Sequence, residues 1–160
     1  MRITIYTDGS ARGNPGPGGY GVVLMSEDGH RKEVAKGYRM TTNNRMELLS
    51  VVVALEMLKS KPMDVTIFSD SKYVVDAVEK KWVFNWEKKY FDNKKNPDLW
   101  KRFLRIYREH KVRFVWVKGH ANNVENVRCD KLAVAAAEAE KYHSIDREYE
   151  RGRERGPQLL

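Results

Sequence analysis

The sequence contains a single cysteine, Cys129, among its 160 residues. One cysteine excludes an internal disulfide, and it lacks the Cys and His companions of a structural zinc site. Long apolar runs are missing as well, because no stretch approaches the roughly 20 residues that a membrane-spanning helix needs. The first residues also lack the layout of a signal peptide. We therefore expect a protein without a membrane-spanning segment, located in the cytoplasm.

Acidic residues are too few to balance the basic ones. The chain has 30 Lys and Arg against 22 Asp and Glu, which gives a net charge of +8 at pH 7. Residues 72–118 hold 14 of the basic and 6 of the acidic residues, so the remaining residues are balanced at 16 of each. With 41% hydrophobic residues the chain can form one folded domain. Its excess charge favours a polyanionic partner, either nucleic acid or an anionic membrane surface.

Lysines alternate with large aromatic residues inside this basic stretch. The run comprises Lys80, Lys81, Trp82, Phe84, Trp86, Lys88, Lys89, Tyr90 and Phe91. Such a pattern suits contact with phosphates combined with packing against sugars or bases. It is equally typical of an amphipathic helix with a solvated basic face and an aromatic stripe turned to the core.

Hydrophobic periodicity predicts an α/β fold. We expect strands at 3–7, 20–25, 32–39, 65–68 and 112–117, and helices at 43–59, from 71, from 96 and at 124–142. This order predicts a mixed five-stranded sheet flanked by helices, in which an antiparallel meander is followed by parallel strands. The mixed charges of 143–160 predict a flexible tail. Ligands are then expected at the carboxyl ends of the strands.

Gly16, Gly18 and Gly21 match the spacing of a dinucleotide-binding loop. That loop needs the amino terminus of a helix behind it, to face the pyrophosphate. Here the predicted strand 20–25 follows instead, so we expect no dinucleotide cofactor.

Four carboxylates stand out by position. Asp8 and Asp70 follow predicted strands, Glu47 lies on an otherwise apolar helix, and Asp130 lies near the start of the last helix. Each has a structural alternative: Asp70 can cap a helix, Asp130 can favour a helix dipole, and Glu47 can occupy an exposed stripe. A buried carboxylate without a partner is costly, which favours a function for Glu47. Spacing alone does not bring the four together.

The residues around these carboxylates resemble the motifs of type 1 ribonuclease H of the bacterial kind. Five blocks occur in the family's order: TDGS at 7–10 with GNPGPGGYG at 13–21, TNNRMEL at 42–48, SDSKYV at 69–74, VKGHA at 117–121 and RCDKLA at 128–133. The resemblance covers residues 1–142, and it implies a ribonuclease H-like catalytic domain over that range, monomeric and without a membrane partner.

The resemblance also implies an activity, the hydrolysis of the RNA strand of RNA–DNA hybrids to 5′-phosphate and 3′-hydroxyl products. It places Asp8, Glu47, Asp70 and Asp130 in one cluster that binds two metal ions. Carboxylate oxygens suit Mg²⁺, with Mn²⁺ as a substitute. Two such ions activate water and stabilise the leaving oxygen in this type of hydrolysis.

Further residues receive roles from the resemblance. His120 would carry a proton or assist product release, as its near-neutral intrinsic pKa allows. Asn14, Asn43 and Asn44 would line the minor groove of the hybrid, where the 2′-hydroxyl distinguishes RNA from DNA. Thr42 would contact a phosphate of the DNA strand. Residues 80–96 would form a substrate-binding protrusion, with Trp82 and Trp86 set against the DNA strand. Four lysines would lie near phosphates: Lys80, Lys81, Lys88 and Lys89.

Two alternatives remain open from the residues. A noncatalytic module that binds hybrids or duplex RNA needs the basic surface but not the four carboxylates. A DNA-directed nuclease of the same fold shares the acidic cluster, although the block at 43–47 favours the hybrid.

Overall fold

A computed structural model describes residues 1–119 and 123–155 of the chain. Its strands are β1 (Arg2–Ala11), β2 (Gly16–Ser26), β3 (Arg31–Thr41), β4 (Asp64–Ser69) and β5 (Lys111–Trp116). Its α-helices are α1 (Asn43–Glu56), α2 (Lys72–Glu79), α3 (Trp82–Lys88), α4 (Pro97–Tyr107), α5 (Val124–Glu138) and α6 (Arg147–Arg155), with a 3₁₀ turn at Glu140–Tyr142.

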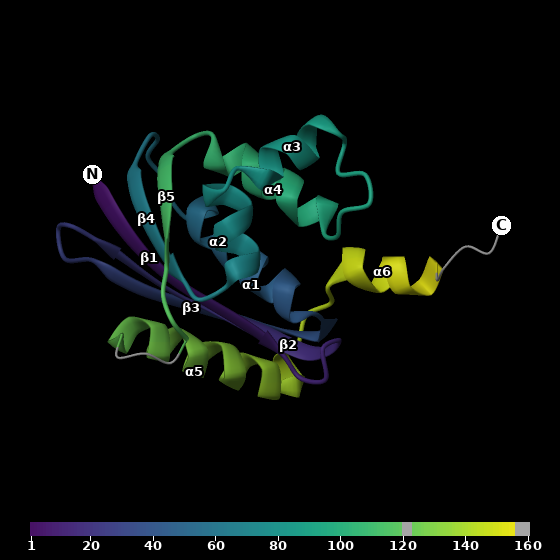
Figure 1. Cartoon of the computed structure of the whole chain (residues 1–160). Coiled ribbons are helices and arrows are strands. Elements are labelled where there is room, and N and C mark those ends of the chain that lie inside the picture. The colour runs from purple at the N-terminus through teal and green to yellow at the C-terminus, as the bar shows by residue number, and fades with distance from the viewer. Residues whose placement is uncertain (120–122, 156–160) are drawn as a thin grey trace.

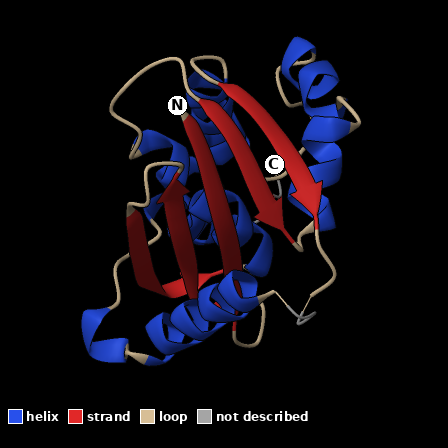
Figure 2. Cartoon of the chain, turned by 90° about the vertical axis from the view of Figure 1, so that its left-hand side faces the viewer, coloured by secondary structure: helices blue, strands red, loops and turns tan. Residues whose placement is uncertain are grey.

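The five strands form one sheet in the order β3-β2-β1-β4-β5. β1, β2 and β3 pair antiparallel, whereas β4 pairs parallel with both β1 and β5. Helices α1 and α2 lie on one face of the sheet, and α5 crosses the other face (Figure 1, Figure 2). The prediction of a mixed sheet, antiparallel first and parallel afterwards, is confirmed. None of the helices in the described residues is long and apolar enough to span a membrane.

Helix α1 occupies the centre of the core. Thr42 caps it by accepting a hydrogen bond from the backbone N–H of Arg45 through its side chain, at 3.2 Å. Its apolar side chains point in nearly all directions, and most of them are fully buried: Met46, Leu48, Leu49, Val51, Val52, Ala54 and Leu55. A helix that is apolar all round is stable only when it is covered on every side. α1 is therefore held between the sheet and α4.

Helix α5 lies close to the sheet because small residues meet at the contact. A Cβ atom at Gly37 of β3 would overlap the carbonyl oxygen of Ala136 on α5. The helix ends at Glu138 rather than at the predicted Tyr142, since Ala139 leaves the helical region with φ −82° and ψ 67°.

Two further elements differ from expectation. The aromatic-basic run contains a separate short helix, α3, in which Val83 is buried and Trp82 and Lys88 are exposed. Lys80, Lys81 and Lys89 lie outside this helix, so the run does not form one amphipathic helix with a basic face. Residues 143–155, expected to be part of a flexible tail, instead pair with β3 at Ser144 and continue into α6. The physical reason is Asp146, which is buried and accepts hydrogen bonds from the side chains of Arg45 and Thr41.

Candidate active site

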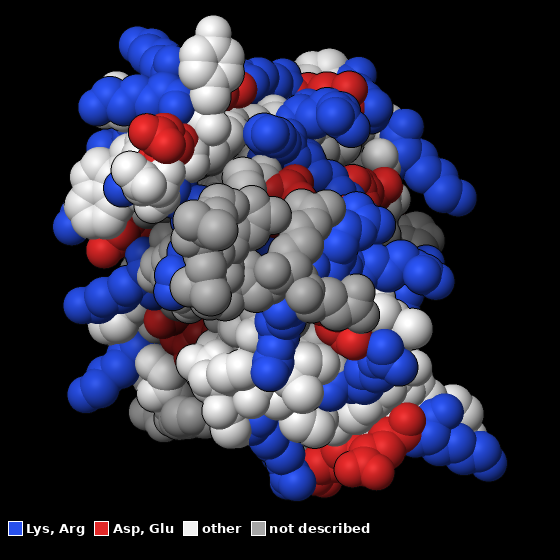
Figure 3. All heavy atoms as spheres, turned by 90° about the vertical axis from the view of Figure 1, so that its right-hand side faces the viewer, with Lys and Arg blue, Asp and Glu red and all other residues white. Residues whose placement is uncertain are grey.

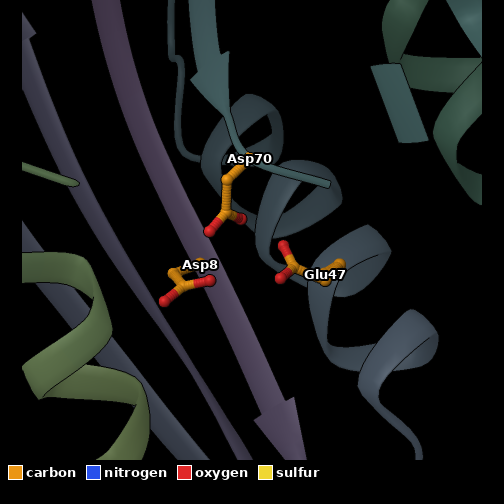
Figure 4. A group of neighbouring side chains, drawn as sticks. All are labelled: Asp8, Glu47 and Asp70. Atoms are coloured by element: carbon orange, nitrogen blue, oxygen red, sulfur yellow. The ribbon is translucent and has the colours of Figure 1, made fainter. Parts of the chain in front are cut away.

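Asp8, Glu47 and Asp70 converge at one end of the sheet (Figure 4). Each offers a carboxylate oxygen, and these three oxygens all lie within 4.8 Å of one another. Asp8 lies in β1 and Asp70 directly follows β4, which runs parallel to β1 with Tyr6 opposite Phe68. Asp8 lies two residues after Tyr6, and Asp70 lies two residues after Phe68. Both carboxylates therefore reach the same end of this strand pair. Strand register thus brings together two carboxylates that are far apart in sequence.

Glu47 joins them because α1 approaches β1 closely. A Cβ atom at Gly9 would lie 2.5 Å from the backbone nitrogen of Glu47. Only glycine leaves room for the helix backbone here. Glu47 lies in the second turn of α1 and points to the strand that carries Asp8 (Figure 4). The glycine that follows Asp8 therefore permits the third carboxylate to reach the first.

Bringing three carboxylates together in a buried place costs electrostatic free energy. Asp8 and Glu47 are only 8% and 9% exposed. Burial, reinforced by the neighbouring Asp70 carboxylate, raises the pKa of Asp8 to about 7. Burial also raises the pKa of Glu47 well above its usual value, and the charges of Asp8 and Asp70 add to the effect. Clustered, desolvated carboxylates resist ionisation unless a positive charge joins them.

A backbone hydrogen bond offsets part of this cost. Asp8 accepts one from the backbone N–H of Gly9 at 3.0 Å. The Oε2 atom of Glu47 is buried and has no hydrogen-bond partner among the described residues. A buried oxygen left in this state is one that a bound cation would satisfy. The donor set of hard carboxylate oxygens fits Mg²⁺ or Mn²⁺.

Asp130 lies beside this group without belonging to its tightest part. It lines the same pocket of about 450 Å³ as Asp8, Glu47 and Asp70. Its carboxyl group also interacts with that of Asp8 and contributes to the raised pKa there. The structure therefore brings all four predicted carboxylates to one pocket and places three of them within ligand distance of each other.

The predicted residues of the minor groove border this pocket. Asn43 and Asn44 line it together with the carboxylates. Asn14, Thr42 and Asn44 line a second pocket, also of about 450 Å³. The side-chain oxygen of Asn14 accepts a hydrogen bond from the backbone N–H of Asn43 at 2.9 Å, and Asn43 accepts one from Ala11. These bonds fix the turn at 13–15 against the start of α1.

The aromatic-basic segment, residues 80–91, contains α3 (Figure 1), and none of its residues is among those that line the acidic pocket. The four predicted lysines Lys80, Lys81, Lys88 and Lys89 are all exposed. Figure 3 shows Lys and Arg side chains spread over much of one face, with Asp and Glu between them.

The two predicted tryptophans of this segment differ in burial. Trp82 is 45% exposed, with the ammonium group of Lys80 5.2 Å from its ring centroid. Trp86 is half-buried and packs edge-on against Trp100 at a centroid distance of 5.8 Å. Of these two tryptophans, Trp82 therefore offers the larger exposed ring surface.

His120 lies outside the described residues. The chain just before it passes the acidic pocket, since a Cβ atom at Gly119 would lie 3.0 Å from Oδ2 of Asp70.

Sequence reasoning did not single out Arg45 or its partners. The Arg45 side chain is 5% exposed and pairs with Asp98 and Asp146, at 2.7 Å in each case. Arg45 lies inside the motif at 43–47, so that motif could have marked it as a candidate residue. Its partners are 53 and 101 residues away, and no local pattern marks them.

Comparison with known proteins decides the family. A family model described as RNase H matches residues 1–138. The chain belongs to the ribonuclease H family. The ribonuclease H of Desulforamulus reducens is 57% identical over 140 residues, covering 84% of this chain and 87% of that protein. The ribonuclease HI of Synechocystis sp. is 50% identical over 139 residues, covering 84% and 86%.

Solved structures agree with this family. The crystal structure of LC9-RNase H1, described as a type 1 RNase H with the type 2 active-site motif, has a TM-score of 0.75 and 33% identity, covering 85% of this chain and 72% of that one. LC11-RNase H1 in complex with RNA/DNA hybrid has a TM-score of 0.66 and 31% identity, covering 87% and 99%. The predicted family and fold are thereby confirmed, and the chain is a ribonuclease H enzyme. Family and fold indicate hydrolysis of the RNA strand of hybrids, and the family generally uses divalent metal ions.

Proposed function

We propose that this enzyme hydrolyses the RNA strand of RNA–DNA hybrids in the pocket of Asp8, Glu47, Asp70 and Asp130, leaving 5′-phosphate and 3′-hydroxyl ends. The observation that carries this proposal is the group of three carboxylates with oxygens within 4.8 Å of one another. The partnerless Oε2 of Glu47 supports cation binding at the same place. Two Mg²⁺ ions held there would activate the attacking water and stabilise charge on the departing 3′ oxygen.

The chain's own groups hold and orient these ions and the substrate. Asp8, Glu47 and Asp70 provide the tightest set of oxygen ligands, and Asp130 provides a further oxygen at the wall of the pocket. With its pKa near 7, Asp8 keeps its proton in the ion-free pocket at lower pH and releases it when a cation binds. His120 serves as a proton carrier or assists product release.

Substrate choice rests on groups that surround the acidic pocket. The amides of Asn14, Asn43 and Asn44 can both donate to and accept from a ribose 2′-hydroxyl, which only the RNA strand carries. Thr42 contacts a phosphate of the DNA strand. The exposed lysines Lys80, Lys81, Lys88 and Lys89 attract the backbone electrostatically. Of the two predicted tryptophans, the more exposed Trp82 lies against the DNA strand, while Trp86 packs against Trp100.

Cleavage of an end-labelled RNA–DNA hybrid tests this proposal. The hybrid is incubated with and without Mg²⁺, beside double-stranded DNA and double-stranded RNA of the same sequence. We expect RNA-strand cleavage of the hybrid alone, only with Mg²⁺, and ends that a ligase requiring 5′-phosphate can join. Binding without cleavage would identify a noncatalytic module, and equal cleavage of the DNA duplex would identify a DNA-directed nuclease.

A further inference from the structure

Helix α6 lies beyond the 138 residues that the family model matches. It is attached to the domain by several contacts of residues 144–153, among them a hydrogen bond from Arg153 to the sulfur of Met40 at 3.0 Å. Ser144 exchanges backbone hydrogen bonds with β3, donating to Gly37 at 2.9 Å and accepting from Arg39 at 3.0 Å. Asp146 accepts a hydrogen bond from the Nε atom of Arg45 at 2.7 Å. The guanidinium group of Arg39 binds both carboxylate oxygens of Glu150, at 2.8 and 2.9 Å.

These attachments bring α6 to the amino-terminal end of α1. The buried Asp146 also accepts from the hydroxyl of Thr41 at 2.8 Å, next to Thr42 in sequence. Its backbone oxygen and its carboxylate accept from the N–H groups of Glu150 and Tyr149, so it caps α6 as well. A single carboxylate therefore connects α6 to the segment that carries Thr42, Asn43 and Asn44.

Because α6 lies beside the start of α1, it forms one wall of a polar pocket. The pocket has a volume of about 450 Å³, and its lining comes from four parts of the chain: Asn14, Pro15, Thr42, Asn44, Lys95, Asn96 and Tyr149. Tyr149 is the contribution of α6. No carboxylate lines this pocket, whereas four carboxylates line the neighbouring acidic one.

Asn14 and Thr42 use acceptor atoms in their hydrogen bonds in this pocket, whereas the NH₂ group of Asn96 already donates to the hydroxyl of Tyr73 at 3.0 Å. The oxygen of the Asn14 amide accepts from Asn43, and the hydroxyl oxygen of Thr42 accepts from Arg45. The NH₂ group of Asn14 and the O–H group of Thr42 remain as donors. Lys95 adds an exposed ammonium group, and the α1 amino terminus adds the positive end of a helix dipole. This set of donors fits an anion with several oxygens, as a phosphate group has.

We propose that α6 belongs to the substrate-binding surface, and that the hydroxyl of Tyr149 donates a hydrogen bond to a backbone phosphate of the hybrid in this pocket. The inference rests on the proposed function, because it takes the hybrid as substrate. Tyrosine hydroxyls are common donors to nucleic-acid phosphates. The guanidinium carbon of Arg153, 5.9 Å from the Tyr149 ring centroid, packs over that ring on the same side of the helix.

A comparison of single phosphates tests the contact directly. Hybrids are prepared with one methylphosphonate, which removes the phosphate charge, at successive positions of the DNA strand and, in a second set, of the RNA strand. Binding is measured in EDTA, which prevents cleavage, for the wild type, Tyr149→Phe and Tyr142→Phe. Tyr142 is the matched control, since it is 74% exposed and lies outside the lining of the pocket. Thermal melting checks that Tyr149→Phe keeps the fold.

We expect Tyr149→Phe to weaken binding of the unmodified hybrid about 3- to 10-fold, the value of one hydrogen bond. At one phosphate position, the methylphosphonate should weaken hybrid binding by the wild type but should weaken binding by Tyr149→Phe little further. Whether this position lies in the DNA set or the RNA set identifies the contacted strand. Tyr142→Phe should behave as the wild type. Wild-type affinity of Tyr149→Phe, or the same additional loss at every position, would overturn the inference while the proposed function stands. A wild type that binds no hybrid would overturn both.

Discussion

The Nε atom of Arg45 lies 2.7 Å from Oδ2 of Asp146, joining the first turns of α1 to a residue 101 positions further along the chain. Both side chains are less than 10% exposed. Arg45 lies two residues before Glu47, so the pair connects the C-terminal segment to the helix that carries a proposed metal ligand. The segment expected to be a tail is thus part of the support of the active site.

Removing the Asp146 carboxylate should destabilise the protein. Asp146→Ala leaves the buried Arg45 with Asp98 as its remaining ion-pair partner, beside a hydrogen bond to Asn96. Loss of one member of a buried ion pair costs about 3 kcal/mol of unfolding free energy. Urea denaturation followed by circular dichroism measures it. Glu148→Ala is the control, because Glu148 pairs with Arg151 at the surface and should have little effect. Equal stability of the two variants would contradict a structural role for Asp146.

The acidic cluster should make the ion-free enzyme less stable as the pH rises. Unfolded Asp8 loses its proton near the usual value of 3.8, whereas the folded pocket holds that proton until about pH 7. Between these values the folded state binds more protons, so the contribution of Asp8 to stability falls with increasing pH. In EDTA, Asp8→Asn should match the wild type near pH 4 and exceed it by about 1–3 kcal/mol at pH 8.

Denaturation of both proteins at several pH values checks this difference. Groups that do not interact with Asp8 cancel in it, and it includes the effect of the Asp8 charge on the pKa of Glu47. Mg²⁺ should raise the melting temperature of the wild type more than that of Asp8→Asn, since a ligand stabilises the state that binds it. A difference between the two proteins that does not change with pH would contradict the raised pKa.

Substitutions of Trp82 and Trp86 should have different effects, one on hybrid binding and the other on the free energy of unfolding. Trp82→Ala removes an exposed ring and should weaken hybrid binding about tenfold, in the range of one stacking contact, with no change in melting temperature. Trp86→Ala removes the packing against Trp100 and should cost about 2 kcal/mol of unfolding free energy. Binding titrations and thermal melts of both variants decide. Equal losses of binding and of stability in the two variants would contradict the different roles assigned to the two rings.

Loss of His120 should slow turnover without abolishing it. His120→Ala removes a proton carrier, and such groups contribute on the order of 10²-fold to the rate. The turnover rate is measured with saturating hybrid, which separates it from binding. His30→Ala serves as the control, because His30 is exposed and pairs only with Asp28 among the described residues. An unchanged turnover rate in His120→Ala would exclude this role.

The sequence predicts the carboxylates of the active site better than it predicts the ion pair that holds the C-terminal segment against α1. The sequence pattern predicts Asp8 and Asp70 at strand ends and Glu47 on a largely apolar helix, and the family motifs point to the same residues. Asp70 does follow the end of β4, whereas β1 continues past Asp8 to Ala11 because residues 9–11 still pair with β2. The ion pair of Arg45 with Asp146 has no local pattern, because its geometry depends on the folding of the whole chain. The charged composition of 143–160 therefore predicts a tail, although the buried carboxylate of Asp146 attaches residues 143–155 to the domain.

Tertiary packing also distinguishes residues that look alike in the sequence. Trp82 and Trp86 occur in the same basic run with the same kind of neighbours. Only the position of Trp100 on α4 makes Trp86 half-buried and leaves Trp82 exposed.

The rate of RNA-strand cleavage in Asp70→Asn tests the central claim most directly. The wild type, Asp70→Asn and Asp64→Asn are compared on one RNA–DNA hybrid, with Mg²⁺ and with EDTA. Asp64 is the control carboxylate, exposed at the start of β4 and away from the acidic pocket. We expect Asp64→Asn to cleave as the wild type does, and Asp70→Asn to lose roughly 10³-fold or more in rate, since the metal site supplies several kcal/mol of charge stabilisation. Cleavage by Asp70→Asn at a rate near that of the wild type, or wild-type cleavage that continues in EDTA, would contradict the account.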